Sequence, residues 1–219
     1  MDVLVLLHTE LSAPGRIAPS LSELGARVFQ ARYCLGEALP RDIAEFDAMV
    51  VLGGPMSCHD PALSIERDLI DQYLSTGKPF FGVCLGAQLL NLAYGGQVEP
   101  CPQGQVQMGW HPLLGLDADF DGLNQVYQWH SDWIEVPSAL SVTARDDAGR
   151  VQGIRRGMHH GVQFHPEADA SLRQQWLERA AHKLIGPGAQ PADLHQSLGR
   201  DQDPIVSRWL DGFLARQLV

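Results

Sequence analysis

The sequence predicts an α/β fold with an open, mostly parallel β-sheet flanked by helices and a small antiparallel β extension. Short β-rich runs alternate with longer segments of helical periodicity over residues 1–96. This alternation is typical of parallel sheets that carry helices on both faces. After residue 97, shorter and more polar β segments follow one another, which indicates antiparallel pairing.

The elements follow in order along the chain. Residues 61–75 carry apolar side chains at helical spacing, and Gly77 marks the end of that helix. In the first half we expect strands at 2–8, 28–33, 46–52 and 79–83, and helices at 19–26, 61–75 and 86–94. In the second half we expect strands at 97–100, 107–113, 125–129, 141–145 and 151–155, a return to the main sheet at 161–164, and helices at 170–184 and 204–218.

Residues 186–191 form a break rich in glycine and proline between the last two helices. The segment after this break is too small to fold alone. We therefore expect residues 1–219 to form one domain, with residues 186–219 as its C-terminal loop and helix.

Composition narrows the range of functions. Of the 219 residues 45% are hydrophobic, and the net charge is −10. The hydrophobic share is ordinary for a globular protein, whereas a nucleic-acid binder needs a basic surface. No apolar run approaches the roughly 18 residues of a membrane-spanning helix. The apolar residues 2–7 are too few, and lack the preceding basic stretch, for a signal peptide. We expect neither nucleic acid nor a membrane as a partner.

The cysteines and histidines indicate location and metal use. None of the four cysteines forms a C-x-x-C pair. With no export signal, this favours reduced thiols and a cytoplasmic location. The nine histidines include no H-E-x-x-H spacing, so we expect no metal site.

Cys84 lies where an apolar strand meets a helix. Gly82 and Gly86 flank it two residues away on each side, the spacing of a nucleophile elbow with cysteine in place of serine. On such a tight turn, larger side chains at the glycine positions would collide. The positive end of the helix favours thiolate over thiol, and the backbone N–H of Leu85 can help to hold an oxyanion. The pattern predicts Cys84 as a nucleophile.

A thiolate enzyme needs a proton carrier and a group that orients it. An apolar run ends in His165, and Glu167 follows after Pro166. Side chains at i and i+2 of an extended segment can face the same way. Glu167 can therefore accept the Nδ1 proton of His165 and leave Nε2 toward Cys84.

Gly53 and Gly54 follow another buried strand and precede Pro55. Glycine permits close approach of the backbone to a ligand. Because the carboxyl ends of parallel strands meet at one edge of the sheet, this turn can supply a second oxyanion donor beside Cys84.

With these three features, the chain resembles the class I glutamine amidotransferase domains of the Cys-His-Glu type, over roughly residues 1–185. Within that family it is similar to the stand-alone group related to the amidotransferase domain of GMP synthase. His8, the turn at Pro14 and Gly15, and the ending with Trp209 and Phe213 carry this finer similarity. The family has a flavodoxin-like fold.

The resemblance implies that Cys84 attacks the side-chain amide of glutamine, releases ammonia and leaves a γ-glutamyl thioester for water to cleave. His165 would carry the proton and Glu167 would orient it. The oxyanion donors correspond to Gly54 and Leu85.

The resemblance also implies a substrate pocket. Gln88 corresponds to the family's glutamine one helical turn after the cysteine. A later Ser-His-Gly-Asp-like loop, which holds the α-amino and α-carboxylate groups of the substrate, corresponds to His130, Ser131 and Asp132. Here Trp129 and Ser131 depart from the commoner residues, which bears on what the pocket accepts beyond glutamine.

The chain has no G-x-x-x-x-G-K-[ST] loop, no Ser-Gly-Gly-x-Asp-Ser motif and no dinucleotide fingerprint. We expect no cofactor and no activation of an acceptor by ATP. Three functions stay open: a glutaminase that passes ammonia to a separate synthetase partner, a free-standing γ-glutamyl hydrolase or peptidase, and a non-catalytic binding or regulatory module. The predicted triad argues against the third.

Overall fold

The computed structural model describes residues 1–219. Its strands are β1 (Asp2–Leu6), β2 (Arg27–Ala31), β3 (Ala48–Val51), β4 (Phe80–Val83), β5 (Gln97–Pro100), β6 (Gln107–Pro112), β7 (Leu114–Gly115), β8 (Gln125–His130), β9 (Asp132–Glu135), β10 (Ser141–Arg145), β11 (Val151–Arg156) and β12 (His159–Val162). Its α-helices are α1 (Ile17–Glu23), α2 (Ser64–Leu74), α3 (Leu85–Ala93), α4 (Ala170–Ala180) and α5 (Ala192–Gln217). Short 3₁₀ turns precede α2 at Pro61–Leu63 and follow α4 at Ala181–Lys183.

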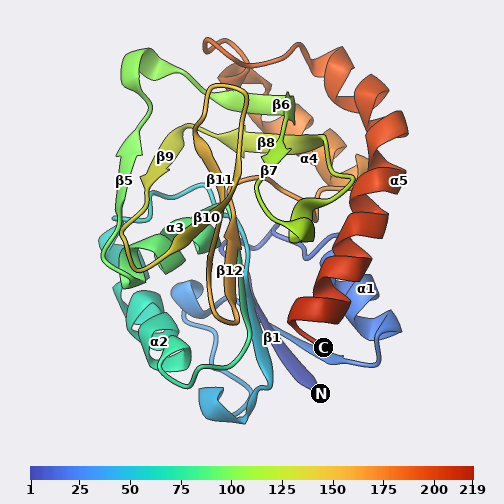
Figure 1. Ribbon diagram of the computed structural model, residues 1–219. Helices are drawn as coiled ribbons and strands as arrows, with labels where there is room; N and C mark the ends of the chain where they lie inside the picture. Colours follow the sequence, from blue (N-terminus) through green and yellow to red (C-terminus); the bar gives the residue numbers. More distant parts are fainter.

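One eight-stranded sheet runs through the centre of the molecule in the order β2-β1-β3-β4-β12-β11-β10-β7 (Figure 1). In this sheet order, the first five strands, β2 through β12, pair in parallel with their neighbours. The remaining pairs, β12 with β11, β11 with β10 and β10 with β7, are antiparallel. The predicted mostly parallel sheet is confirmed, and so is the return of the chain to it, which occurs at β12.

Helices cover both faces of this sheet, as the strand–helix alternation predicts (Figure 1). Side chains of β1 alternate between the two layers: Val3 and Val5 belong to the core beneath α1 and α5, whereas Leu4 and Leu6 belong to the core beneath α2 and α3. All five residues of β1 are buried. A strand covered on both faces tends to be apolar throughout, which explains why β1 shows no polar alternation after Asp2.

The antiparallel extension consists of β7, β10 and β11 in the main sheet and two separate ribbons, β5 with β9 and β6 with β8. Neither β7 nor β9 was predicted from the sequence. Because β9 begins at Asp132, the stretch expected to be a loop is a corner between two strands, with Ser131 between them.

The last helix begins at Ala192, so the predicted start at 204 is wrong. Pro204 lies inside α5, where it removes one helical hydrogen bond. Before and after the proline, α5 buries residues against the rest of the molecule, among them His195 and Trp209. This burial offsets the missing bond.

Asp203, just before that proline, forms an ion-pair cluster with Arg173 and Arg16. The guanidinium of Arg173 is almost fully buried and donates to both carboxylate oxygens of Asp203, at 2.6 and 2.7 Å. It also donates to the carbonyl of Ala168 at 2.8 Å, and Arg16 donates to the carbonyls of Pro166 and Ala168 at 3.2 and 3.0 Å. The cluster therefore ties α4 and α5 to the segment that follows β12.

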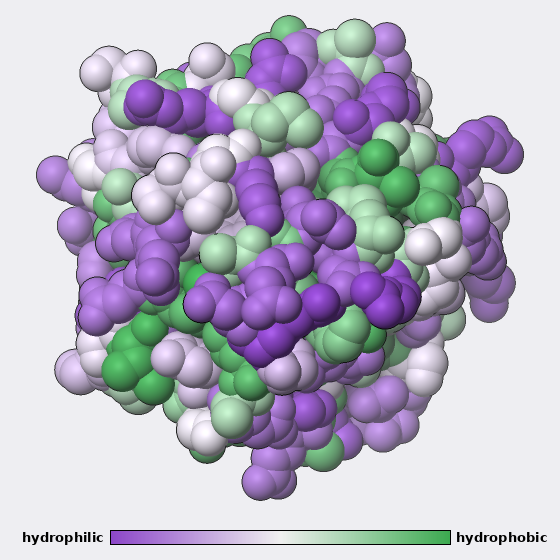
Figure 2. Space-filling model, turned by 90° about the horizontal axis from the view of Figure 1, so that it is seen from below, coloured by the Kyte–Doolittle hydropathy of each residue, from purple (hydrophilic) through white to green (hydrophobic).

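Figure 2 shows the molecule from below, where hydrophilic residues predominate and hydrophobic ones form only scattered patches. Both chain termini lie toward this side in Figure 1. None of the helices combines the length and the apolar character that crossing a membrane requires.

Replacing Asp203 with alanine leaves the buried Arg173 guanidinium without its partner. We expect Asp203→Ala to lower the free energy of unfolding by about 3 kcal/mol, measured by denaturant titration. Asp201→Ala is the matched control, because Asp201 is exposed on the same helix and forms no ion pair; its effect should stay within about 0.5 kcal/mol. Equal effects of the two substitutions would contradict the role of the cluster.

Candidate active site

Cys84 connects β4 to α3 in a conformation that side chains rarely adopt, with φ 51° and ψ −104°. A Cβ atom on Gly82 would lie 2.4 Å from the carbonyl oxygen of Gly86, so the predicted collision across the turn is confirmed. A Cβ atom on Gly86 would instead lie 2.0 Å from the carbonyl oxygen of Val51, in the neighbouring strand β3. The N–H of Cys84 donates to Val162 of β12 at 2.8 Å. The elbow is thus held by the strands on both sides of it.

Helix α3 begins at Leu85, directly after the cysteine. The first N–H groups of a helix have no acceptor within it, and the helix dipole places partial positive charge there. Cys84 is 6% exposed. The helix start therefore places partial positive charge beside the sulfur, and Cys84 lines the cavity described below.

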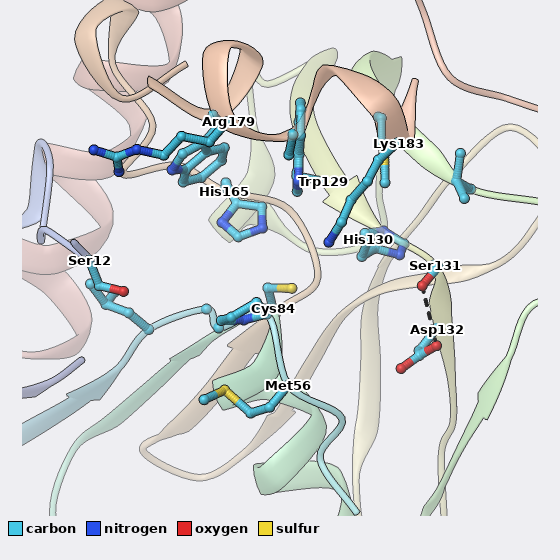
Figure 3. A pocket seen from close by; sticks show the side chains of 18 of the residues that line it. Ser12, Met56, Cys84, Trp129, His130, Ser131, Asp132, His165, Arg179 and Lys183 are labelled. Atoms are coloured by element: carbon cyan, nitrogen blue, oxygen red, sulfur yellow. Dashed lines mark hydrogen bonds between the residues drawn. The ribbon is translucent and has the colours of Figure 1, made fainter. Parts of the chain in front are cut away.

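His165 and Glu167 lie on the segment after β12, at the same edge of the sheet. The Nδ1 atom of His165 lies 2.8 Å from Oε1 of Glu167, and both side chains are buried. The N–H of His165 donates to the carbonyl of Tyr127 in β8 at 2.8 Å. Nε2 of His165 has no hydrogen-bond partner, so this nitrogen is available on the side facing Cys84 (Figure 3).

The charges of these groups affect one another strongly. Burial by itself would lower the pKa of His165, but the nearby charges of Glu167 and then Cys84 outweigh it and raise the pKa to about 10. His165 therefore holds its proton through neutral pH, and the Glu167 carboxylate and the Cys84 sulfur stabilise the resulting imidazolium.

The turn at Gly15 supports Glu167 from behind. Gly15 has φ +50°, and a Cβ atom there would lie 2.0 Å from the carbonyl oxygen of Glu167. The next N–H along the chain, that of Arg16, donates to this same oxygen at 3.1 Å. This contact gives a physical reason for the Pro14 and Gly15 turn on which part of the family resemblance rests.

Gly53 and Gly54 follow β3 and lie beside the cysteine and histidine. A Cβ atom on Gly53 would lie 2.7 Å from Cε1 of His165 and 3.4 Å from Cβ of Cys84. The N–H of Gly54 makes no hydrogen bond within the chain. Gly54 was predicted from the sequence as part of the site, but the closer approach of Gly53 was not, because it follows from packing against His165 and has no motif of its own.

These groups face a cavity of about 580 Å³. All but one of the predicted site residues line it: Gly54, Cys84, Gln88, His130, Ser131, Asp132, His165 and Glu167. The exception is Leu85, which follows Cys84 at the start of α3 and is buried; only its backbone N–H was predicted to take part. The structure thus brings the predicted residues together at one site.

His130 and Asp132 also line the cavity, and Figure 3 shows both to one side of Cys84. Burial, followed by the charge of His165, lowers the pKa of His130 to about 3, so its ring stays neutral. Neither ring nitrogen of His130 has a hydrogen-bond partner. The hydroxyl of Ser131 lies 3.5 Å from the Asp132 carboxylate, and the Gln88 side chain makes no hydrogen bond within the chain. The side chains of His130 and Gln88 thus leave hydrogen-bonding groups without a protein partner in the lining of the cavity.

Helix α4 and the turn after it add a wall that was not predicted from the sequence. Trp176 packs edge-on against His165, with ring centroids 4.9 Å apart, and lies 5.9 Å from Trp129. Arg179 and Lys183 also line the cavity, and neither forms an ion pair or a hydrogen bond. Figure 3 shows them on opposite sides of His165, above Cys84. No short motif marks these residues, because their position depends on how α4 packs over the sheet edge.

The structure contains no group of three or more histidine, cysteine or acidic side chains arranged to hold a metal ion. All four cysteines are free thiols.

Comparisons with known proteins agree with this architecture. The family "Glutamine amidotransferase class-I" matches residues 10–184. The glutamine amidotransferase-like protein YfeJ of Salmonella typhimurium is 28% identical over 84% of this chain and 83% of its own length. A glutamine-hydrolysing GMP synthase subunit from Ignicoccus hospitalis is 35% identical over 58% of this chain and 70% of its own length. A crystal structure of a glutamine amidotransferase from Thermotoga maritima superposes with a TM-score of 0.89 at 25% identity, covering 99% of this chain and 97% of the other.

The electrostatics of the site can be tested by NMR titration of the histidine rings. Because the pKa of His165 is raised above the ordinary value of about 6.5, we expect this ring to stay protonated up to about pH 10. The stability that the charged pair adds is fully present below pH 6.5 and is lost as the pH rises through 10.

Glu167→Gln removes the largest favourable charge, so the pKa of His165 should fall, whereas Glu178→Gln on the exposed side of α4 should leave it in place. A His165 ring that titrates near pH 6.5 in the unmodified protein would contradict this description.

Proposed function

Because the chain belongs to the class I glutamine amidotransferase family, we propose that it hydrolyses the γ-amide of glutamine through a thioester on Cys84 and releases ammonia. The observation that carries the proposal is the hydrogen-bonded pair of His165 and Glu167 next to a strained cysteine at a helix start. This is the arrangement of nucleophile, proton carrier and orienting carboxylate that thiol catalysis needs.

In the first half of the reaction, Sγ of Cys84 attacks the γ-carbonyl carbon and forms a tetrahedral intermediate. The N–H groups of Gly54 and Leu85 stabilise its oxyanion. The carbon–nitrogen bond then breaks, the leaving nitrogen takes the proton from Nε2 of His165, and ammonia departs. Glu167 stabilises the imidazolium and fixes the ring through Nδ1.

In the second half, water attacks the thioester carbonyl. His165, now neutral, takes a proton from the water, and a second tetrahedral intermediate forms in the same oxyanion site. The carbon–sulfur bond breaks, which releases glutamate and restores the thiolate beside the imidazolium. The histidine thus acts first as acid and then as base.

The α-ammonium and α-carboxylate groups of the substrate are assigned to the part of the cavity lined by Gln88, His130, Ser131 and Asp132. Asp132 supplies a negative charge for the ammonium, and the side chains of Gln88, His130 and Ser131 supply hydrogen-bonding groups without a net charge. The lowered pKa of His130 supports this role. A charged His130 ring would repel the imidazolium of His165, whereas the neutral ring can lie near it and still form hydrogen bonds.

The similar protein from Ignicoccus hospitalis is named as one subunit of its enzyme. By analogy, the ammonia released here passes to a separate synthetase protein, since this chain carries no phosphate-binding loop.

A γ-glutamyl conjugate is the second candidate substrate. The cavity of about 580 Å³ falls in the range of roughly 300–1,000 Å³ that suits drug-sized ligands, which are larger than glutamine. Its lining includes Trp129 and Trp176 together with the unpaired cations of Arg179 and Lys183. Figure 3 labels Trp129, Arg179 and Lys183. A γ-glutamyl amide whose amine part is apolar and bears a carboxylate matches this lining, and the same thioester chemistry would cleave it.

The roles of the triad can be separated by substitution. Cys84→Ala should abolish release of ammonia and glutamate, a loss of at least about 10⁴-fold in kcat, while the melting temperature stays close to that of the unmodified protein. Glu167→Ala should cause a smaller loss than His165→Ala, by roughly tenfold to a hundredfold, because it removes the orienting group and not the proton carrier. Unchanged turnover by Cys84→Ala would refute the proposal.

The choice of substrate can be tested with a panel that contains glutamine, neutral γ-glutamyl amides and γ-glutamyl amides bearing a carboxylate. If the conjugate is the substrate, kcat/KM for the acidic amide should exceed that for glutamine, and Lys183→Gln or Arg179→Gln should raise KM for the acidic amide more than for the neutral one. Arg208→Gln is the matched control, because Arg208 is exposed, forms no ion pair and does not line the cavity. A higher kcat/KM for glutamine than for every amide in the panel would favour the glutaminase function. If none of the compounds is turned over, the non-catalytic binding or regulatory module is the function that remains.

A further inference from the structure

Two ionisable side chains are completely buried beneath the turn at Gly53 and Gly54. His8 follows β1 and Glu66 lies in the first turn of α2, and the side chains of both are 0% exposed. Nε2 of His8 lies 2.7 Å from Oε1 of Glu66, and Nδ1 of His8 lies 3.2 Å from the carbonyl oxygen of Gly53. Neither side chain lines the cavity. The pair therefore contacts the backbone of the site without contacting the substrate.

The hydrogen bonds of His8 fix where its protons lie. A carbonyl oxygen only accepts hydrogen bonds, so Nδ1 carries a proton and donates it to Gly53. The short contact between Nε2 and Glu66 needs a second proton, which either an imidazolium or a protonated carboxyl supplies. In both cases Glu66 holds the ring with Nδ1–H directed at Gly53.

This arrangement is costly to bury. Oε2 of Glu66 has no hydrogen-bond partner, and its neighbours on the same face of α2 are Leu69 and Ile70. Burying a charged or polar group with an unpaired oxygen destabilises the folded state, and an apolar residue would serve packing alone better. Because the pair contacts the backbone of the site, its role is better sought in the site than in the stability of the fold.

The peptide between Gly53 and Gly54 is planar and trans, so its carbonyl and its N–H point in opposite directions. With the carbonyl held by His8, the N–H of Gly54 points away from His8, and it has no acceptor within the chain. A Cβ atom on Gly54 would lie 2.7 Å from Cβ of His8 and 2.9 Å from Cδ2 of Leu85. Gly54 therefore lies against both His8 and Leu85, the residue that bears the other proposed oxyanion donor.

From these contacts we infer that His8 and Glu66 are a positioning pair, which holds the Gly53–Gly54 peptide so that the Gly54 N–H is ready to receive the oxyanion. The inference rests on the proposed thioester mechanism. Neither residue is a catalytic residue, because neither touches the reacting atoms.

A positioning role makes a kinetic prediction that general destabilisation does not. An oxyanion donor acts on the transition state and not on the bound substrate, so its misalignment lowers kcat and leaves KM unchanged. Complete loss of one such donor typically costs about 10²–10³-fold in kcat. The alkylation rate of Cys84 by iodoacetamide does not depend on this donor, so it should be preserved.

The test compares two double variants that differ in one hydrogen-bond donor. In His8→Asn/Glu66→Gln the asparagine amide occupies the place of Nδ1 and can donate to Gly53, whereas in His8→Ala/Glu66→Gln nothing can. Both variants lack the buried carboxylate. Ammonia and glutamate release are measured from glutamine and from a γ-glutamyl amide, with iodoacetamide alkylation and melting temperature measured on the same samples.

We expect the alanine variant to lose about a hundredfold in kcat, with KM and the alkylation rate within about twofold of the unmodified protein, and the asparagine variant to recover most of kcat. Equal kcat for the two variants would overturn the inference while leaving the thioester mechanism intact. If the alanine variant does not fold, the asparagine variant alone decides: a hundredfold loss of kcat in a folded asparagine variant would overturn the inference. If the unmodified protein turns over neither substrate, the proposed function fails and this inference fails with it.

Discussion

The strained turn at Cys84 is the constraint on which the rest of the structure depends. With φ at 51°, the residue must be held by its surroundings, because an isolated chain would relax to a more common conformation. Strand β12 supplies the acceptor for its N–H, and the carbonyl of Val51 in β3 leaves no space for a side chain at Gly86. A parallel sheet with β4 in its interior is thus what keeps the sulfur exposed to the cavity at the start of α3.

The other groups of the site reach Cys84 because their strands end at the same edge, and each is fixed by buried contacts behind it. Glu167 and the Gly15 turn hold the His165 segment, and the cluster around Asp203 ties that segment to two helices. His8 and Glu66 lie behind Gly53 in the same way. Buried polar pairs are a poor source of stability but a good means of fixing one geometry. Their gathering around this edge is consistent with a site that must be rigid before the substrate arrives.

Local patterns predicted much of this arrangement. Strand–helix alternation predicted the parallel sheet, and the spacing of Gly82, Cys84 and Gly86 predicted the elbow, because these signals reside in a few consecutive residues. The features that escaped prediction depend on partners far apart in the sequence. Pro204 favours a helix start, but burial on both sides of it lets α5 begin at Ala192. Likewise, Trp176 and Lys183 reach the cavity only through the packing of α4, which no motif records.

The central claim, that Cys84 carries a γ-glutamyl group during turnover, can be tested by intact-protein and peptide mass spectrometry after rapid acid quenching of the reaction with glutamine or a γ-glutamyl amide. We predict a fraction of the protein that is heavier by one glutamyl residue, with the added mass on the peptide that contains Cys84 and absent from Cys84→Ala. An adduct on another residue, or glutamate release without any adduct at Cys84 under conditions in which the chemical step is faster than hydrolysis of the thioester, would contradict this claim.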